Sequence, residues 1–183
     1  MKIGILSDTH DHLGRTQVAI DLLIDRGAES LVHCGDLTGP PIVEACSRLP
    51  FYFVFGNHDA DMASLLDDAA TEFGANCLHW GGEISLAEKR IAVAHGHIPN
   101  DFRPLLAVNP DYFLFGHSHT THDSMDGDLR PAIVAFAIQL RPSIRSFATK
   151  RFCIVSVAPT IVVVWIAYNK LLNFVSELWW MHL

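Results

Sequence analysis

Basic residues are scarce in this chain of 183 residues. Thirteen Lys and Arg stand against twenty Asp and Glu, which gives a formal net charge of −7 when histidine is neutral. Such an excess of negative charge repels extended polyanions unless a local basic stripe or a metal cluster offsets it. We therefore do not expect long nucleic acid as a substrate or partner.

Cysteine pairs and a long apolar N-terminal run are also missing. The run 3–6 is too short for the hydrophobic region of a signal peptide. The cysteines form no C-x-x-C pair, so they suggest neither a disulfide framework nor a thiolate zinc site. Free thiols in a reducing cytoplasm are the expectation. The four cysteines are Cys34, Cys46, Cys77 and Cys153.

The apolar pattern predicts one α/β domain. Short runs rich in β-branched and aromatic residues end at polar or glycine-bearing turns, as buried strands of α/β proteins do. Helices are expected at 15–26, 40–48 and 61–72, and turns at Gly81-Gly82 and Pro99-Asn100. The predicted strands are 2–6, 30–34, 51–55, 90–94 and 112–115.

Histidine is abundant, with eleven residues, and several lie in short polar clusters. Each cluster follows a predicted strand, and functional groups of α/β sheets gather beyond the carboxyl ends of strands. Carboxylate, imidazole and amide oxygen suit divalent ions such as Mn, Fe or Zn. We expect the clusters to converge on one metal site. They are Ser7-Asp8-Thr9-His10, Gly35-Asp36, Gly56-Asn57-His58-Asp59, His95-Gly96-His97 and Gly116-His117-Ser118-His119.

The ordered set D-x-H, G-D, G-N-H-D, H-G-H and G-H-x-H resembles the calcineurin-like metallophosphoesterase superfamily. The opening SDTHDHLG and the overall size resemble its small single-domain phosphodiesterase branch, to which the retromer subunit Vps29 is related. This resemblance implies a four-layer α/β/β/α sandwich. It covers roughly residues 1–125.

The resemblance also implies two metal ions bridged by Asp36, Mn first, with Fe, Zn or Ni as alternatives. Water activated by the pair would cleave a phosphate ester. One ion would be held by Asp8, His10, Asp36 and His119, and the other by Asp36, Asn57, His95 and His117.

His58 resembles the family histidine that contacts the phosphoryl group, and Asp59 is placed to orient it. His97 is expected beside the ligands or facing the substrate. Arg103 could bind phosphate, although a solvated surface role fits it better. Structural or surface roles are expected for His12, His33, His79 and His122.

The composition changes near residue 130. Residues 1–130 hold nineteen of the twenty acids, and 131–183 hold only Glu177. We therefore divide the chain into a catalytic core, 1–130, and an atypical apolar segment, 131–183. This segment is a divergent pair of closing strands (132–138 and 161–168), a membrane span within 152–168, or the product of a reading-frame shift.

These observations predict a metal-dependent phosphodiesterase that acts on a small phosphate ester. Two alternatives stay open: a phosphomonoesterase that uses the same site, and a Vps29-like scaffold without catalysis. The intact ligand set argues against the scaffold. A homo-oligomer is compatible with the sequence, and a membrane partner is not expected.

Overall fold

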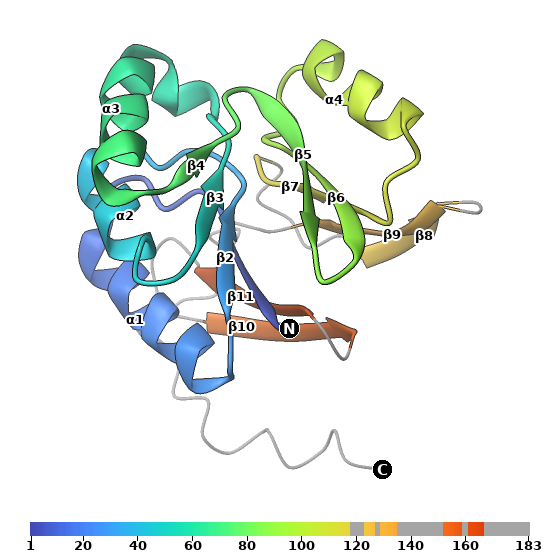
Figure 1. The fold of residues 1–183 in the computed structure, drawn as a ribbon, viewed down its shortest axis with the longest axis horizontal. Coiled ribbons are helices and arrows are strands. Elements are labelled where there is room, and N and C mark those ends of the chain that lie inside the picture. Colours follow the sequence, from blue (N-terminus) through green and yellow to red (C-terminus); the bar gives the residue numbers. More distant parts are fainter. Residues whose placement is uncertain (118–122, 127–128, 135–151, 159–160, 167–183) are drawn as a thin grey trace, which may run out of the picture.

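Strands and helices alternate along the first half of the chain, as the apolar runs predict. The computed structural model describes residues 1–117, 123–126, 129–134, 152–158 and 161–166. The helices are α1 (Leu13–Asp25), α2 (Pro40–Cys46), the 3₁₀-helix η1 (Asn57–Met62), α3 (Ala63–Phe73) and α4 (Pro99–Ala107). The strands, drawn in Figure 1, are β1 (Ile3–Leu6), β2 (Ser30–His33), β3 (Phe51–Phe53), β4 (Asn76–Cys77), β5 (Gly81–Leu86), β6 (Lys89–Ala94), β7 (Tyr112–Phe115), β8 (Asp123–Asp126), β9 (Leu129–Val134), β10 (Phe152–Ala158) and β11 (Ile161–Ile166).

The first sheet has the strand order β10-β11-β1-β2-β3-β4 and is parallel except for β10 at its edge. The pairing of β1 with β2 ends with Leu6 opposite His33. Both strands therefore end at the same level. The polar clusters that follow them start side by side, which the hydrogen bond from Asp8 N to the carbonyl oxygen of Gly35 (2.9 Å) confirms.

The second sheet has the order β5-β6-β7-β9-β8. Strands β6, β7 and β9 are parallel, whereas β5 and β8 are antiparallel to their neighbours. Strands β6 and β7 also end at the same level. The hydrogen bond from Gly116 N to the carbonyl oxygen of His95 (3.1 Å) shows this. The clusters after β6 and β7 are thereby held next to each other.

Three apolar clusters among the described residues separate four layers. Helices α1, α2 and α3 pack on one face of the first sheet, where Leu6, Leu31 and Phe53 lie. The alternate residues of the same strands, such as Ile5 and Val32, face the second sheet. Helix α4 covers the far side of the second sheet (Figure 1), where Leu105 and Leu106 lie against Ala92, Ala94 and Phe113. The α/β/β/α order expected from the resemblance is confirmed.

Two predicted turns are wrong. Gly81 and Gly82 begin β5, and the chain reverses at Ala87 and Glu88, whose φ angles of 51° and 61° are those of a tight hairpin turn. A glycine pair suggests a turn because glycine readily adopts positive φ. In this hairpin Ala87 and Glu88 adopt positive φ instead. Pro99 begins helix α4, a position where its missing N–H costs nothing.

Residues beyond 130 contribute strands to both sheets. Strand β9 crosses the proposed boundary at residue 130 and pairs with β7, while β11 pairs with β1. The expected closing strands 132–138 and 161–168 overlap β9 and β11, and the rest of each lies outside the described residues. The segment considered as a membrane span contains the antiparallel pair β10 and β11. No helix in the described part of the chain has both the length and the apolar character to cross a membrane.

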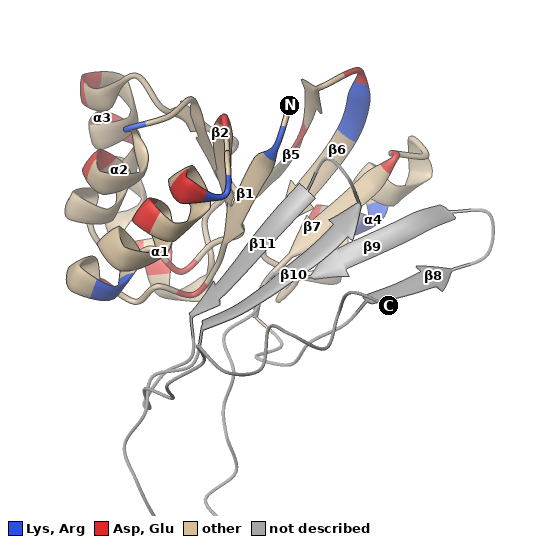
Figure 2. Cartoon of the chain, turned by 90° about the horizontal axis from the view of Figure 1, so that it is seen from below, with Lys and Arg blue, Asp and Glu red and all other residues tan. Residues whose placement is uncertain are grey.

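Acidic residues mark the outer helical layer (Figure 2). Helices α1, α2 and α3 carry six Asp or Glu, and Arg15 is their one basic residue. Arg48 pairs with Asp21, but the excess of acids on this face opposes the approach of a polyanion. The acids are Asp21, Asp25, Glu44, Asp67, Asp68 and Glu72.

Candidate metal centre

The polar clusters that follow β1, β2, β3, β6 and β7 converge at the carboxyl ends of both sheets. His95, which follows the second sheet, lies beside Asp36 and Asn57, which follow strands of the first. Both sheets therefore contribute to one site, as the order of the clusters predicts. His119 and His122 lie outside the described residues, as does the rest of the last cluster beyond His117.

Asp36 occupies the middle of this site, with 1% of its surface exposed. Its Oδ2 atom lies 3.7 Å from His10 Nε2 and 3.5 Å from His95 Nε2. Its Oδ1 atom accepts a hydrogen bond from the backbone N–H of His58 (2.9 Å). Burial would raise the pKa of Asp36, but the hydrogen bond and charge attraction with His95 and the amide of His58 lower it to about 2. Asp36 is therefore a carboxylate at neutral pH.

The ring of His95 is buried and its orientation is fixed. Its Nδ1 atom lies 2.7 Å from the carbonyl oxygen of Cys34, which can only accept, so Nδ1 carries a proton. Nε2 consequently faces Asp36 Oδ2 at 3.5 Å and Asn57 Oδ1 at 3.1 Å. Burial lowers the pKa of His95, but Asp36 more than compensates and raises it above the ordinary value. A ring nitrogen facing two oxygens is stabilised by a proton or by a metal cation.

Asn57 connects the two sheets at this point. Its Oδ1 atom lies 3.1 Å from His95 Nε2 and 3.1 Å from His117 Nδ1. Two imidazoles and an amide oxygen at such short separations form a donor set that suits a divalent metal ion. The residues present therefore fit the metal chemistry that the polar clusters predict.

Asp36 belongs to both groups of ligating side chains found here. One group is Asp8, Asp36 and His95, and the other is His10, Asp36 and His58; within each, the ligand atoms lie within 4.8 Å of one another. Asp36 is thus the residue that the two groups at this site share, and its bridging role stays a prediction. The partners differ from the expected division, because Asp8 is grouped with His95 and His10 with His58.

The backbone at the candidate ligands is strained. Non-glycine residues with positive φ cost roughly 1–3 kcal/mol each and persist only where the surroundings hold them. Such residues gather at this site and are held by cross-loop hydrogen bonds, including His10 N to the carbonyl oxygen of Asp36 (3.0 Å). A residue that only caps a helix usually has β-region backbone angles, so a capping role would not explain these positive φ values. The φ angles are 53° at Asp8, 45° at His10, 59° at Asp36 and 66° at His117.

Two glycines allow the loops to approach this closely. A Cβ atom on Gly35, whose φ is 98°, would lie 2.5 Å from His95 Nδ1. A Cβ atom on Gly116 would collide with Ser7 Oγ and lie 2.8 Å from Asp8 Oδ2. Any larger residue at either position would push a candidate ligand out of place.

Asp59 does not orient His58 as expected. Its buried carboxylate accepts hydrogen bonds from the backbone N–H groups of Asp36 (2.8 Å), Leu37 (3.2 Å), Thr38 (2.7 Å) and Gly56 (2.8 Å). Burial raises its pKa, and these hydrogen bonds offset the shift only in part. Asp59 thus holds the loop that carries Asp36, a role that becomes visible only when loops after β2 and β3 are packed together.

His58 is exposed at the rim of the site. Its ring meets that of His10 edge to face, with centroids 5.1 Å apart and planes at 77°. Its backbone N–H already binds Asp36, so the side chain is held near the ligands while facing solvent.

His97 lies between the candidate ligands and a neighbouring pocket. Its ring centroid is 5.2 Å from that of His95 and 5.9 Å from that of His117. Burial first, and then the two neighbouring histidines, lower its pKa. His97 therefore lies next to the candidate ligands and lines a pocket.

The remaining histidines divide into buried and peripheral ones. His33 is fully buried, its Nε2 lies 3.1 Å from Thr9 Oγ1, and burial lowers its pKa to about 3. His79 forms a separate group with Asp67 and Cys77, whose ligand atoms lie within 4.8 Å. The alternation Cys77-x-His79 could have signalled this group, in the same way as Asp8-x-His10 does.

The chain belongs to the calcineurin-like phosphoesterase superfamily, whose domain model matches residues 1–135. It is 27% identical to phosphodiesterase MJ0936 of Methanocaldococcus jannaschii over 122 residues. This aligned segment covers 65% of this chain and 74% of that protein. The membership inferred from the five motifs is confirmed, and with it the metallophosphoesterase class.

Solved structures share the fold at low sequence identity. A novel archaeal phosphodiesterase superposes with a TM-score of 0.64 at 24% identity, covering 74% of this chain and 84% of that one. Yfce, a phosphoesterase from E. coli, gives a TM-score of 0.60 at 21% identity, with 83% and 87% covered. A Vps29 single mutant from Entamoeba histolytica gives 0.54 at 19% identity, with 85% and 86% covered. These likenesses establish the architecture.

Proposed function

We propose that this protein is a metal-dependent phosphodiesterase whose centre takes two divalent ions, with Mn as the first choice. The observation that carries the proposal is the position of Asp36, whose carboxylate lies between His10 and His95 where both sheets end. The relationship to a protein named phosphodiesterase supports the substrate class. Fe, Zn and Ni are alternatives that suit the same donor set.

Seven side chains would hold the two ions, with Asp36 shared between them. When bound, such a pair supplies Lewis-acid stabilisation of the phosphoryl oxygens and lowers the pKa of water. By the family resemblance, Asp8, His10, Asp36 and His119 would hold one ion, and Asp36, Asn57, His95 and His117 would hold the other, although the structure groups Asp8 with His95 and His10 with His58.

The chain's own residues add positioning and proton transfer. The carbonyl oxygen of Cys34 holds His95 with Nε2 toward the centre, and Asp59 holds the loop that carries Asp36. His58 would stabilise charge on the phosphoryl group or give a proton to the leaving oxygen, and its exposure at the rim supports this role. A small phosphate ester reaches this rim, whereas the acidic helical layer disfavours long nucleic acid.

The test is hydrolysis of bis-p-nitrophenyl phosphate by chelator-stripped protein, with and without added Mn²⁺. We expect activity that depends on the metal. Hydrolysis of p-nitrophenyl phosphate in preference to the diester would point to a phosphomonoesterase. A folded protein that binds Mn²⁺ and hydrolyses neither compound would overturn the proposal and favour a binding scaffold.

The three described cysteines Cys34, Cys46 and Cys77 are free thiols. They fit a reducing compartment, and we propose the cytoplasm as the site of action. Localisation of the tagged protein by microscopy or fractionation tests this.

A further inference from the structure

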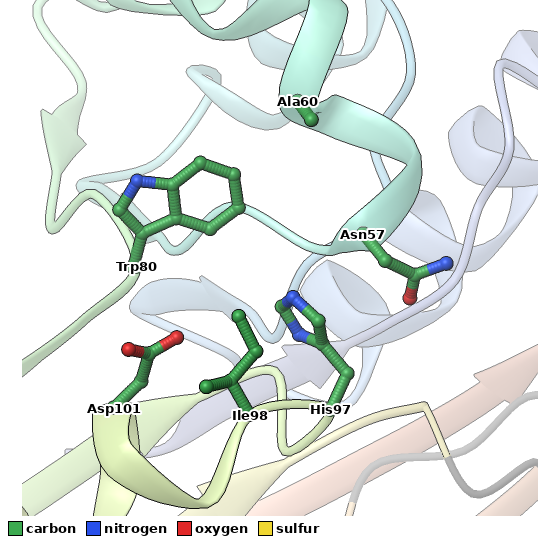
Figure 3. A pocket seen from close by; sticks show the side chains of 6 residues that line it. All are labelled: Asn57, Ala60, Trp80, His97, Ile98 and Asp101. Atoms are coloured by element: carbon green, nitrogen blue, oxygen red, sulfur yellow. The ribbon is translucent and has the colours of Figure 1, made fainter.

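A pocket of about 380 Å³ opens beside the candidate metal centre. It lies between η1 and the start of α4. Its volume is within the range of small-molecule sites, roughly 300–1,000 Å³. Six residues line it, as Figure 3 shows: Asn57, Ala60, Trp80, His97, Ile98 and Asp101.

Asn57 joins this pocket to the metal centre. It forms one end of the pocket in Figure 3, with Trp80 and Asp101 at the other end and His97 between them. The ring of His97 is 6.1 Å from that of Trp80 and 5.9 Å from that of His117, centroid to centroid. A ligand whose phosphate lies at the metal centre could therefore place a second group against Trp80.

The walls of the pocket offer an aromatic face and an aliphatic side chain. Trp80 is 38% exposed and Ile98 is 41% exposed, so both offer accessible apolar surface to the pocket. Trp80 is nevertheless held in place, because its ring packs edge to face on Phe55 with centroids 5.4 Å apart. A fixed and accessible indole is a surface on which a planar ring can stack.

Asp101 adds a charged acceptor at the same end of the pocket. A carboxylate accepts hydrogen bonds from N–H groups and repels phosphate. The pocket therefore excludes a second phosphate group and favours a planar ring with N–H donors on one edge. Nucleobases combine these properties.

We propose that this pocket binds the nucleobase of a nucleoside phosphodiester, and this inference rests on the proposed phosphodiesterase function. The base stacks on Trp80 next to Ile98, and its N–H edge faces Asp101. The phosphate lies at the metal centre beyond Asn57. A guanine base fits Asp101 best because its ring N–H and amino group can both donate to one carboxylate.

The test measures binding by titration calorimetry on the Mn²⁺-loaded protein, so it does not depend on turnover. The two probes are guanosine 5′-monophosphate and ribose 5-phosphate, which differ by the base alone. Stacking on an aromatic side chain is worth about 1–3 kcal/mol, so the nucleotide should bind the wild type about 5- to 150-fold more tightly than ribose 5-phosphate. Trp80→Ala should remove most of this preference, while Trp80→Phe should remove less of it.

Two further variants complete the design. Asp101→Asn should weaken binding of the nucleotide several-fold and leave ribose 5-phosphate unchanged. Leu65→Ala, which removes an exposed apolar side chain on α3 outside the pocket, should change neither affinity.

Equal affinities of the wild type for both probes would overturn the proposal, as would the absence of any binding. An equal loss for both probes in Trp80→Ala would also overturn it, since Trp80 would then act only on the structure. Failure of the phosphodiesterase function is recognised separately, because bis-p-nitrophenyl phosphate would not be hydrolysed even if the nucleotide preference were present.

Discussion

Replacing Gly35 by alanine tests whether the close packing of the loops holds the metal centre together. Gly35 has a φ of 98°, and its added Cβ would lie 2.5 Å from His95 Nδ1 and 2.9 Å from the backbone N of Gly56. The backbone conformation alone costs an alanine roughly 1–2 kcal/mol. Crowding in a packed site adds about 1–3 kcal/mol. The expected loss of unfolding free energy is therefore about 2–5 kcal/mol.

Two other glycines allow the backbone cost to be measured separately from the cost of crowding. Gly74 ends α3 with a φ of 68° and has no atom within 4 Å of an added Cβ, so Gly74→Ala carries only the backbone cost. Gly14 lies in α1 with open space around it, and Gly14→Ala should be neutral or stabilising by about 0.5 kcal/mol. Urea denaturation of the metal-free proteins measures all three differences.

Measuring Mn²⁺ binding separates damage to the metal centre from a general loss of stability. Gly35→Ala should weaken Mn²⁺ binding because His95 is displaced from the carbonyl oxygen of Cys34, whereas Gly74→Ala should bind Mn²⁺ as the wild type does. The reasoning is refuted if Gly35→Ala binds Mn²⁺ normally and loses no more stability than Gly74→Ala.

Three further substitutions test individual side chains. Asp36→Asn should abolish binding of the second metal ion and hydrolysis, because it removes the shared carboxylate; full activity during metal titration would contradict the bridging role. His58→Ala should slow turnover while metal analysis shows both ions retained, and a loss of metal would contradict its assignment. His33 has a folded pKa of about 3, below the unfolded value of 6.5, so its contribution to stability is complete above pH 6.5 and is lost as the pH falls toward 3. Wild type should therefore lose about 1.4 kcal/mol more per pH unit than His33→Gln between pH 6 and 4 in urea denaturation, and parallel curves would contradict this.

The location of the site could be predicted because its residues follow strands directly. The end of a parallel strand fixes the edge of the sheet that the next residues occupy, so Asp8, Asp36 and Asn57 had to lie at one edge. His95 joined them because β6 and β7 end at the same side of the second sheet.

Several local features could not be predicted because neighbouring residues do not encode them. The glycines at 81 and 82 signalled a turn, but pairing with Val93 and Ala94 draws them into β5. Helix α4 begins at Pro99, where the sequence suggested only a turn, and its apolar residues Leu105 and Leu106 acquire a partner only when the second sheet is present.

The sequence by itself determined the family, the alternation of strands and helices, and the set of side chains that gather at the strand ends, since these depend on residue type and local spacing. The tertiary structure decided which of them meet. It placed Asp36 between His10 and His95, turned Asp59 toward four backbone amides, and brought Trp80, Asp101 and Asn57 around one pocket. Contacts of this kind join segments far apart in the chain, and their geometry exists only after the two sheets have packed face to face.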